Sequence, residues 1–219
     1  MRRPIPARLG PALALLAALA APPAHAEGER AGAFDYYLLS LSWSPSFCAL
    51  EGRARDEAEC RPGAGRGFLM HGLWPQSERG WPSYCRTEAR DPARDETARM
   101  ADVMGSGGLA WYQWKKHGRC SGLSARDYFA TARAALARVA LPPVFAKLPR
   151  DVTLPASVVE DAFVEANPDL PRDAVTVTCD AGLIREVRIC LTRDLRFRRC
   201  GADTIRDCRM PDAQMPAPK

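Results

Sequence analysis

Two short stretches of this 219-residue chain combine histidine with aromatic and basic residues. Residues 67–75 read GFLMHGLWP and residues 111–120 read WYQWKKHGRC. The chain has three histidines, and His71 and His117 lie in these stretches. Two positioned imidazoles are enough to cleave a phosphodiester without a metal, because one takes a proton while the other gives one. The alternative is a pair of unrelated structural histidines.

The third histidine, His25, lies in a segment that we expect to be removed. A basic start is followed by an apolar run over residues 9–21 and by Ala24-His25-Ala26, which is typical of a cleavage site between small residues. The pattern predicts a signal peptide over residues 1–26, and therefore a periplasmic or extracellular protein without a membrane contact. A retained anchor is the alternative, but the run is shorter than the roughly 20 residues of a membrane span.

Residues 27–219 are enough for one domain with its own core. The whole chain carries a formal charge of +5, and the signal segment holds three arginines and no acidic residue, so the remainder carries about +2 (5 − 3). Such a mild charge does not by itself indicate a nucleic-acid partner.

Eight cysteines all lie after the signal segment, and an even number in an exported chain predicts four disulfides. Zinc is the alternative, but no Cys-x-x-Cys pair occurs and the two remaining histidines stand far apart, so we expect no metal and no cofactor. Eight cysteines allow on the order of 100 pairings, and spacing alone does not choose among them. The cysteines are Cys48, Cys60, Cys85, Cys120, Cys179, Cys190, Cys200 and Cys208.

Apolar runs and turn residues predict strands and helices that do not strictly alternate. Strands are expected over 34–43, 68–73, 174–179, 183–191 and 195–200. Helices are expected over 92–104, 109–116, 124–139 and 156–165. This order favours a single α+β domain, with a central and mostly antiparallel sheet on which helices pack, over a doubly wound sheet. The last residues, 211–219, are expected to be disordered.

Gln113, Lys116 and His117 are spaced i, i+3 and i+4 on a predicted helix, and therefore share one face. This spacing lets their side chains reach one phosphate, where Lys116 would stabilise charge on the oxygens. Trp74 offers a ring on which a base can stack, and Tyr112 extends that surface.

The two stretches resemble the active-site segments of the ribonuclease T2 family, a group of secreted acid endoribonucleases with periplasmic bacterial members. The family's first segment reads HGLWP, which residues 71–75 match without a gap. Its second segment reads roughly HEWxKHGTC. The matching positions here are Trp114, Lys116, His117, Gly118 and Cys120. Weaker similarity runs from about Tyr36 to Cys208.

The resemblance implies a monomeric, metal-independent endoribonuclease that cleaves single-stranded RNA with little base specificity. In such a reaction the ribose 2′-hydroxyl attacks the phosphorus, giving a 2′,3′-cyclic phosphate and then a 3′-phosphate. By analogy with the family, His117 is the base in the first step and His71 is the acid, although the sequence alone does not order them. Imidazole suits both roles because its ordinary pKa is near 6.5.

The resemblance also implies a disulfide pairing. One pair would tie the segment after His71 to the residue three positions after His117. The implied pairs are Cys48–Cys60, Cys85–Cys120, Cys179–Cys208 and Cys190–Cys200.

Four positions depart from the family pattern, and Arg119 in the second segment is one of them. Gln113 stands where the family usually has Glu, Tyr112 where it has another histidine, and Gln76 where some relatives carry an acidic base-reading residue. Gln keeps the hydrogen-bonding shape of Glu but loses its charge, so we expect retained but altered activity with a less acidic optimum. The alternative is a catalytically weak member that binds RNA or a protein. A disulfide-stapled structural or inhibitor domain is a third possibility.

Overall fold

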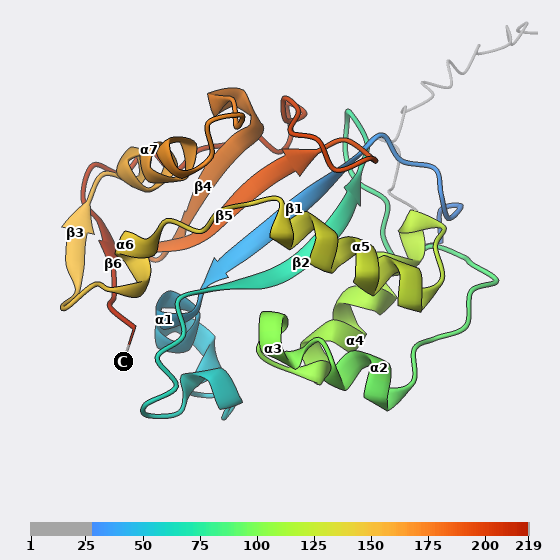
Figure 1. The fold of residues 1–219 in the computed structure, drawn as a ribbon, viewed down its shortest axis with the longest axis horizontal. Helices are drawn as coiled ribbons and strands as arrows, with labels where there is room; N and C mark the ends of the chain where they lie inside the picture. The colour runs from blue at the N-terminus through green and yellow to red at the C-terminus, as the bar shows by residue number, and fades with distance from the viewer. Residues whose placement is uncertain (1–27, 219) are drawn as a thin grey trace, which may run out of the picture.

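The centre of the molecule is a six-stranded sheet with the order β2-β1-β5-β6-β3, and β4 pairs with β5 (Figure 1). The structure, a computed structural model, describes residues 28–218, so the predicted signal peptide over 1–26 lies outside the described residues. Every strand pair is antiparallel except a short β5–β6 contact. The strands are β1 Tyr36–Trp43, β2 Phe68–Gln76, β3 Val152–Leu154, β4 Val175–Asp180, β5 Leu183–Leu191 and β6 Ala213–Met215. This architecture confirms the predicted α+β class.

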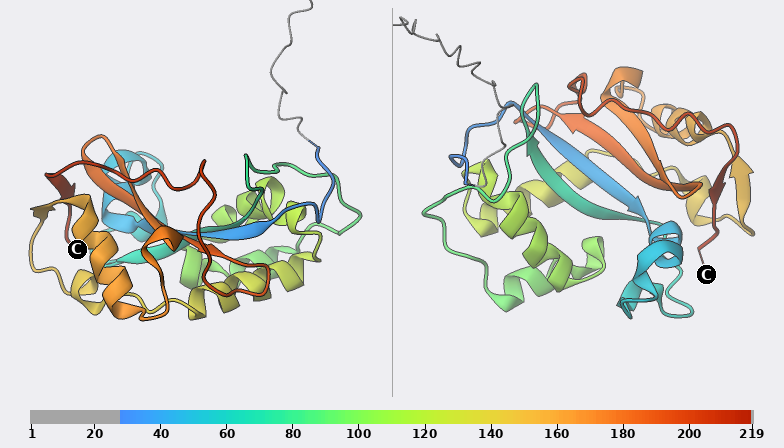
Figure 2. Two further views of the ribbon diagram at one scale, coloured as in Figure 1. Left: turned by 90° about the horizontal axis from the view of Figure 1, so that it is seen from above. Right: turned by 180° about the vertical axis from the view of Figure 1, so that it is seen from behind.

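Helices pack against this sheet, and α5 and α7 lie on the same side of it (Figure 2). The helices are α1 Ser44–Phe47, α2 Arg94–Ala98, α3 Ala101–Met104, α4 Gly107–Lys116, α5 Ala125–Ala137, α6 Pro143–Ala146 and α7 Ala156–Ala166. A short π-helix follows α1 at Cys48–Gly52, and a 3₁₀ turn follows α4 at Gly118–Ser121. Both of these turns contain a disulfide cysteine.

The two faces of the central strands carry different residues because side chains alternate along a strand. Leu39 and Leu41 of β1 point into the main core, where they join Tyr128 of α5 and Phe163 of α7. Trp114 of α4 is fully buried in the same core. Burial of these apolar side chains fixes α4, α5 and α7 against the sheet. The opposite face carries a smaller apolar cluster that includes Tyr36 and Leu38 of β1, and the cleft described below lies beside it.

Several predicted boundaries shift in the structure. Helix α4 begins at Gly107, two residues before the predicted start, because the Ser106 hydroxyl caps it by accepting the Leu109 N–H at 3.1 Å. The helix predicted over 92–104 is two short helices, α2 and α3, separated at residues 99–100. The strand predicted over 195–200 is wrong, because Leu195 has a φ of 62°, which an extended strand does not allow.

The prediction that residues 211–219 are disordered is wrong for 211–218. Residues 213–215 form β6, which pairs with β3 and touches β5. Met215 is fully buried, and the Trp43 indole N–H donates to the Pro216 carbonyl at 2.9 Å. A proline-rich composition pointed to disorder, whereas two apolar side chains and one edge-strand pairing are enough to anchor this segment.

The described residues contain four disulfides, and their pairing is the one that the family resemblance implied. The pairs are Cys48–Cys60, Cys85–Cys120, Cys179–Cys208 and Cys190–Cys200. Cys85–Cys120 ties the loop after β2 to the 3₁₀ turn that follows His117, and so constrains both sides of the predicted site.

Truncating Met215 tests whether the C-terminal strand contributes to stability. We expect Met215→Ala to lower the free energy of unfolding by about 2–5 kcal/mol, because it opens a cavity at a fully buried position. Gln214→Ala is the matched control, because the Gln214 side chain is exposed on the same strand. Denaturant unfolding of both variants measures the difference, and equal stabilities would contradict the assigned role of β6.

Candidate active site

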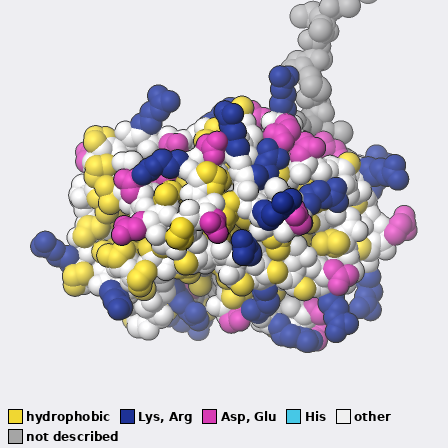
Figure 3. Space-filling model, turned by 45° about the horizontal axis from the view of Figure 1, so that its top comes forward, with side chains coloured by type: hydrophobic (Ala, Val, Ile, Leu, Met, Phe, Trp, Pro, Cys, Tyr) yellow, Lys and Arg dark blue, Asp and Glu magenta, His cyan; other side chains and the backbone are white. Residues whose placement is uncertain are grey.

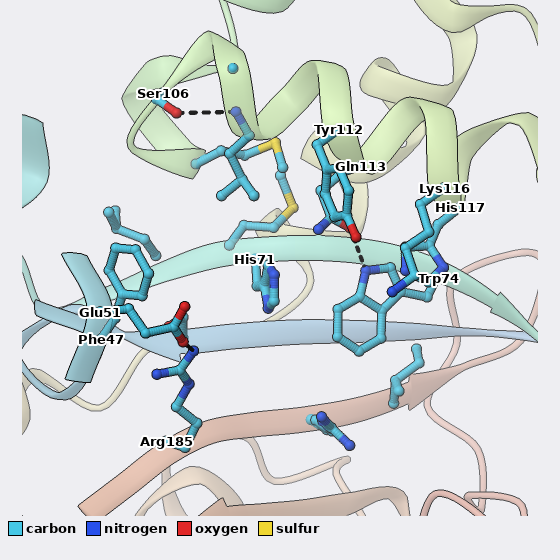
Figure 4. A pocket seen from close by; sticks show the side chains of 18 of the residues that line it. Phe47, Glu51, His71, Trp74, Ser106, Tyr112, Gln113, Lys116, His117 and Arg185 are labelled. Atoms are coloured by element: carbon cyan, nitrogen blue, oxygen red, sulfur yellow. Dashed lines mark hydrogen bonds and ion pairs between the residues drawn. The ribbon is translucent and has the colours of Figure 1, made fainter. Parts of the chain in front are cut away.

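Both predicted histidines line one cleft of about 860 Å³. The cleft lies over the sheet face that does not form the core, between β2, β5, α4 and the segment that follows β1. In Figure 4, His71 and Trp74 rise from β2, while Gln113, Lys116 and His117 approach from α4. Residues about 46 positions apart in the sequence are thus brought to one place, as the two motifs predicted.

A β-bulge decides which side chains of β2 face the cleft. Ser40 of β1 is opposite Gly72 and Leu41 is opposite Met70, so His71 is the extra residue of β2. On a regular strand His71 and Trp74, three positions apart, would point to opposite faces. The bulge shifts the alternation by one residue, and as a result both side chains line the cleft.

Gly72 lies at this bulge because no side chain fits there. A Cβ at Gly72 would lie 2.4 Å from the Trp74 Nε1 and 2.5 Å from the Gln113 Oε1. These two atoms are joined by a hydrogen bond of 2.6 Å. The glycine of the first motif therefore makes room for a contact between the two motifs.

Helix α4 and the turn after it place His117. His117 is the residue that caps the C-terminal end of α4, and its N–H donates to the Gln113 carbonyl at 2.9 Å. The Lys116 carbonyl accepts the Tyr84 N–H at 2.8 Å. These bonds, with the Cys85–Cys120 disulfide, hold the end of the helix against the loop that follows β2.

The indole of Trp74 contacts both imidazoles. The His117 ring stacks on it with centroids 5.0 Å apart and an interplanar angle of 28°, and the His71 ring meets it edge-on at 5.2 Å. The Arg188 guanidinium lies over the same indole at 5.5 Å. These contacts place Trp74 between the two histidines, and it also lines the cleft. That it offers a stacking face for a base stays a prediction.

The remaining predicted residues also line the cleft. Gln113 is almost completely buried. Its Oε1 accepts the Trp74 indole N–H, so the amide nitrogen is the group of Gln113 that could donate to a phosphate oxygen. Gln76 is buried and donates to the neighbouring Pro75 carbonyl at 3.0 Å. Tyr112 is exposed, with the Lys116 Nζ 5.8 Å from its ring centre.

The environment of His117 disfavours its charged form. Burial lowers the pKa of His117 to about 3, and the charges of Lys116 and His71 act in the same direction. Its Nδ1 is buried without a hydrogen-bond partner. This environment therefore favours the neutral form of His117, which is the form that can accept a proton. This effect opposes the less acidic optimum that was expected from Gln113.

His71 has the opposite kind of neighbour, a carboxylate that the motifs did not indicate. The His71 Nδ1 lies 2.6 Å from the Glu186 Oε1. Burial raises the pKa of Glu186, but the hydrogen bond and charge of His71 and the charge of Arg188 outweigh it and lower that pKa to about 2. A sequence signal existed, since Glu186 and Arg188 are charged residues within the largely apolar strand predicted over 183–191.

Within residues 28–218, no group of three or more His, Cys, Asp or Glu side chains is arranged to hold a metal ion. No helix in this range is long and apolar enough to cross a membrane.

The fold and the histidine-bearing site define a ribonuclease-like protein. The profile of the ribonuclease T2 family matches residues 34–200, and the chain belongs to this family. A ribonuclease from Aeromonas hydrophila is 47% identical over 103 residues, 47% of this chain and 45% of that protein. Ribonuclease I from Escherichia coli is 31% identical over 144 residues, 48% of this chain and 54% of that protein.

The chain thus spans about half the length of these two relatives. Among solved structures, an RNase-related protein from Calystegia sepium superposes with a TM-score of 0.62 at 20% identity, over 84% of this chain and 97% of that chain. This likeness shows a shared fold.

Placing a methyl group at the bulge tests the packing of the site. We expect Gly72→Ala to lower the free energy of unfolding by about 1–3 kcal/mol, because the new Cβ overlaps Trp74 and Gln113. Gly108→Ala is the matched control, since its Cβ would meet its nearest neighbour at 3.8 Å and alanine favours the helix. Denaturant unfolding that ranked the two variants equally would contradict the account of the bulge.

Proposed function

We propose that the protein is an exported, metal-independent endoribonuclease that cleaves single-stranded RNA. The observation that carries this proposal is the pairing of two imidazoles against one indole, with one imidazole buried beside cations and the other bonded to a carboxylate. Two imidazoles in such different environments suit the two proton transfers of a phosphodiester cleavage.

His117 acts as the base in the first step, because burial and nearby charge favour its neutral form, and only a neutral imidazole can accept a proton. It takes the proton of the 2′-hydroxyl, and the 2′-oxygen attacks the phosphorus. The bond from phosphorus to the 5′-oxygen breaks, and His71 gives that oxygen a proton. The product is a 2′,3′-cyclic phosphate. Water then opens the ring to a 3′-phosphate with the two roles exchanged.

Lys116 stabilises the charge that develops on the phosphate oxygens. Lys116 is the last residue of α4, directly before His117, and it lines the cleft. Its positive charge lowers the pKa of His117. A cation close enough to disfavour the protonated form of His117 is also close enough to attract the phosphate group at which His117 acts. Arg188, which lines the same cleft, adds a second positive group.

Base specificity is expected to be low. Gln76 is the residue at the position of a base reader, and its amide already donates to the Pro75 carbonyl. Basic and acidic side chains are interspersed on the face shown in Figure 3, without a continuous basic surface. RNA recognition therefore depends on the cleft and on the 2′-hydroxyl that the reaction requires.

A catalytically weak protein that binds RNA is the second candidate. Gln113 and Tyr112 favour it, because neither carries the charge that the family pattern places there. A binder would leave RNA intact, whereas the enzyme releases cyclic-phosphate ends.

Incubation of the oxidised protein with single-stranded RNA in EDTA tests the proposal. We expect cyclic-phosphate products from the wild type, and a loss of roughly 10²–10⁴-fold in rate for His71→Ala and for His117→Ala. Single-stranded DNA of the same sequence is the substrate control and should stay intact, because it lacks the attacking hydroxyl. Intact RNA at every pH would favour the binding function, and cleavage that requires added metal would contradict the mechanism.

Restoring a carboxylate at position 113 tests the charge balance around His117. In Gln113→Glu the carboxylate would counter the effects that lower the pKa of His117. The acidic limb of the kcat/KM profile should therefore move to higher pH, since a base with a raised pKa becomes protonated sooner as the pH falls. Gln113→Ala, which loses the Trp74 bond without adding charge, should lower activity without that shift. Profiles that move equally in both variants would contradict the electrostatic explanation.

A further inference from the structure

Glu186 is a charged residue in the interior of the sheet. It lies on β5, opposite Ser42 of β1 and Thr178 of β4, and only 3% of its surface is exposed. Burying a carboxylate is costly unless it is paired and hydrogen-bonded. The groups around the Glu186 carboxylate must therefore offset the cost of burying its charge.

Both oxygens of Glu186 have a partner. Oε1 lies 2.6 Å from the Nδ1 of His71, and Oε2 accepts from the Arg188 Nε at 2.9 Å and lies 2.7 Å from its terminal nitrogen. Arg188 is two residues further along β5, so it shares a strand face with Glu186. The ion pair between Glu186 and Arg188 thus holds the carboxylate in contact with the imidazole of His71.

We propose that Glu186 is a positioning residue for His71, which rests on the proposed function of His71 as the proton donor to the leaving 5′-oxygen. The carboxylate accepts the Nδ1–H of His71 and thereby directs the opposite ring nitrogen, Nε2, into the cleft. It also stabilises the imidazolium that must be present before the proton is given. Arg188 holds the carboxylate in place through its second oxygen.

The two histidines differ in the hydrogen-bond partner of their Nδ1 atoms. His117 has no partner for its buried Nδ1, whereas His71 has a full negative charge there. The carboxylate that Gln113 does not provide on α4 is present on β5 and acts on the other histidine. Glu186 from β5, Glu59 from the segment after β1, and His117 interact with the charge of His71. Arg188 pairs with Glu186, and other charged residues of the cleft are Glu51, Lys116 and Arg185.

The competing explanation is a purely structural ion pair. Glu186→Gln separates the two, because glutamine keeps the size and one acceptor oxygen but loses the charge. We expect kcat on RNA to fall by at least about 10-fold, below the roughly 10²–10⁴-fold that removal of a proton-transfer group costs, with KM changing less than 3-fold, about 0.6 kcal/mol. Glu186→Asp, which keeps the charge, should recover part of the loss.

The pH profile gives a readout that a structural role does not move. In Glu186→Gln the pH dependence of kcat should change shape, because the variant removes the negative charge that contacts the His71 Nδ1. Asp207→Asn is the matched control, since Asp207 accepts a hydrogen bond from the Thr176 hydroxyl on β4 and lies outside the cleft. Its profile should keep the wild-type shape even if its thermal stability falls.

A measurement on the unmodified protein covers the case in which the variants fail to fold. ¹⁵N NMR of labelled histidine should show that neutral His71 carries its proton on Nδ1. A profile and kcat within 2-fold of wild type in Glu186→Gln, or an Nε2–H tautomer of His71, would overturn the proposal. The NMR experiment needs no RNA, so it is independent of activity. If the wild type were inactive, the proposed function would be refuted, and the tautomer of His71 would still test whether Glu186 positions that ring.

Discussion

The extra residue in β2 is the constraint on which the whole site depends. Without the bulge at His71, that histidine and Trp74 would point to opposite faces of the sheet. Trp74 could not then touch both imidazoles or bond to Gln113 of α4. The first motif thus has a geometric explanation: the histidine occupies the bulge, the glycine leaves room beside it, and the tryptophan returns to the same face.

The sheet and the helix give the two histidines different charge environments. His117 reaches the cleft from the end of α4, where burial and nearby cations keep its pKa low. His71 comes from the edge strand β2, and a buried carboxylate on β5, two strands across the sheet, contacts it. The proposed division of roles follows from which element carries each ring: burial at the helix end favours the neutral form of His117, and the sheet places a carboxylate against His71.

Much of this arrangement could be predicted from the sequence. Hydrophobic patterning found β1, β5 and α7 nearly to the residue, and the motifs placed His71 and His117 in one cleft. The contacts of Trp74 with both histidines could not be foreseen, because the bulge depends on how β1 and β2 pair and strand periodicity does not reveal it. The C-terminal strand β6 was missed because its few buried contacts are with distant residues such as Trp43. Glu186 was missed because no motif contains it.

The central claim is that the fold keeps the catalytic base uncharged. A ¹H NMR titration of the C2 proton of His117, assigned with the His71→Gln variant, measures this state directly. The low pKa of about 3 predicts that this resonance stays unchanged from pH 8 down to about pH 4. A transition centred near pH 6.5, the ordinary value for histidine, would show that His117 is solvated and titrates freely, and would contradict the account.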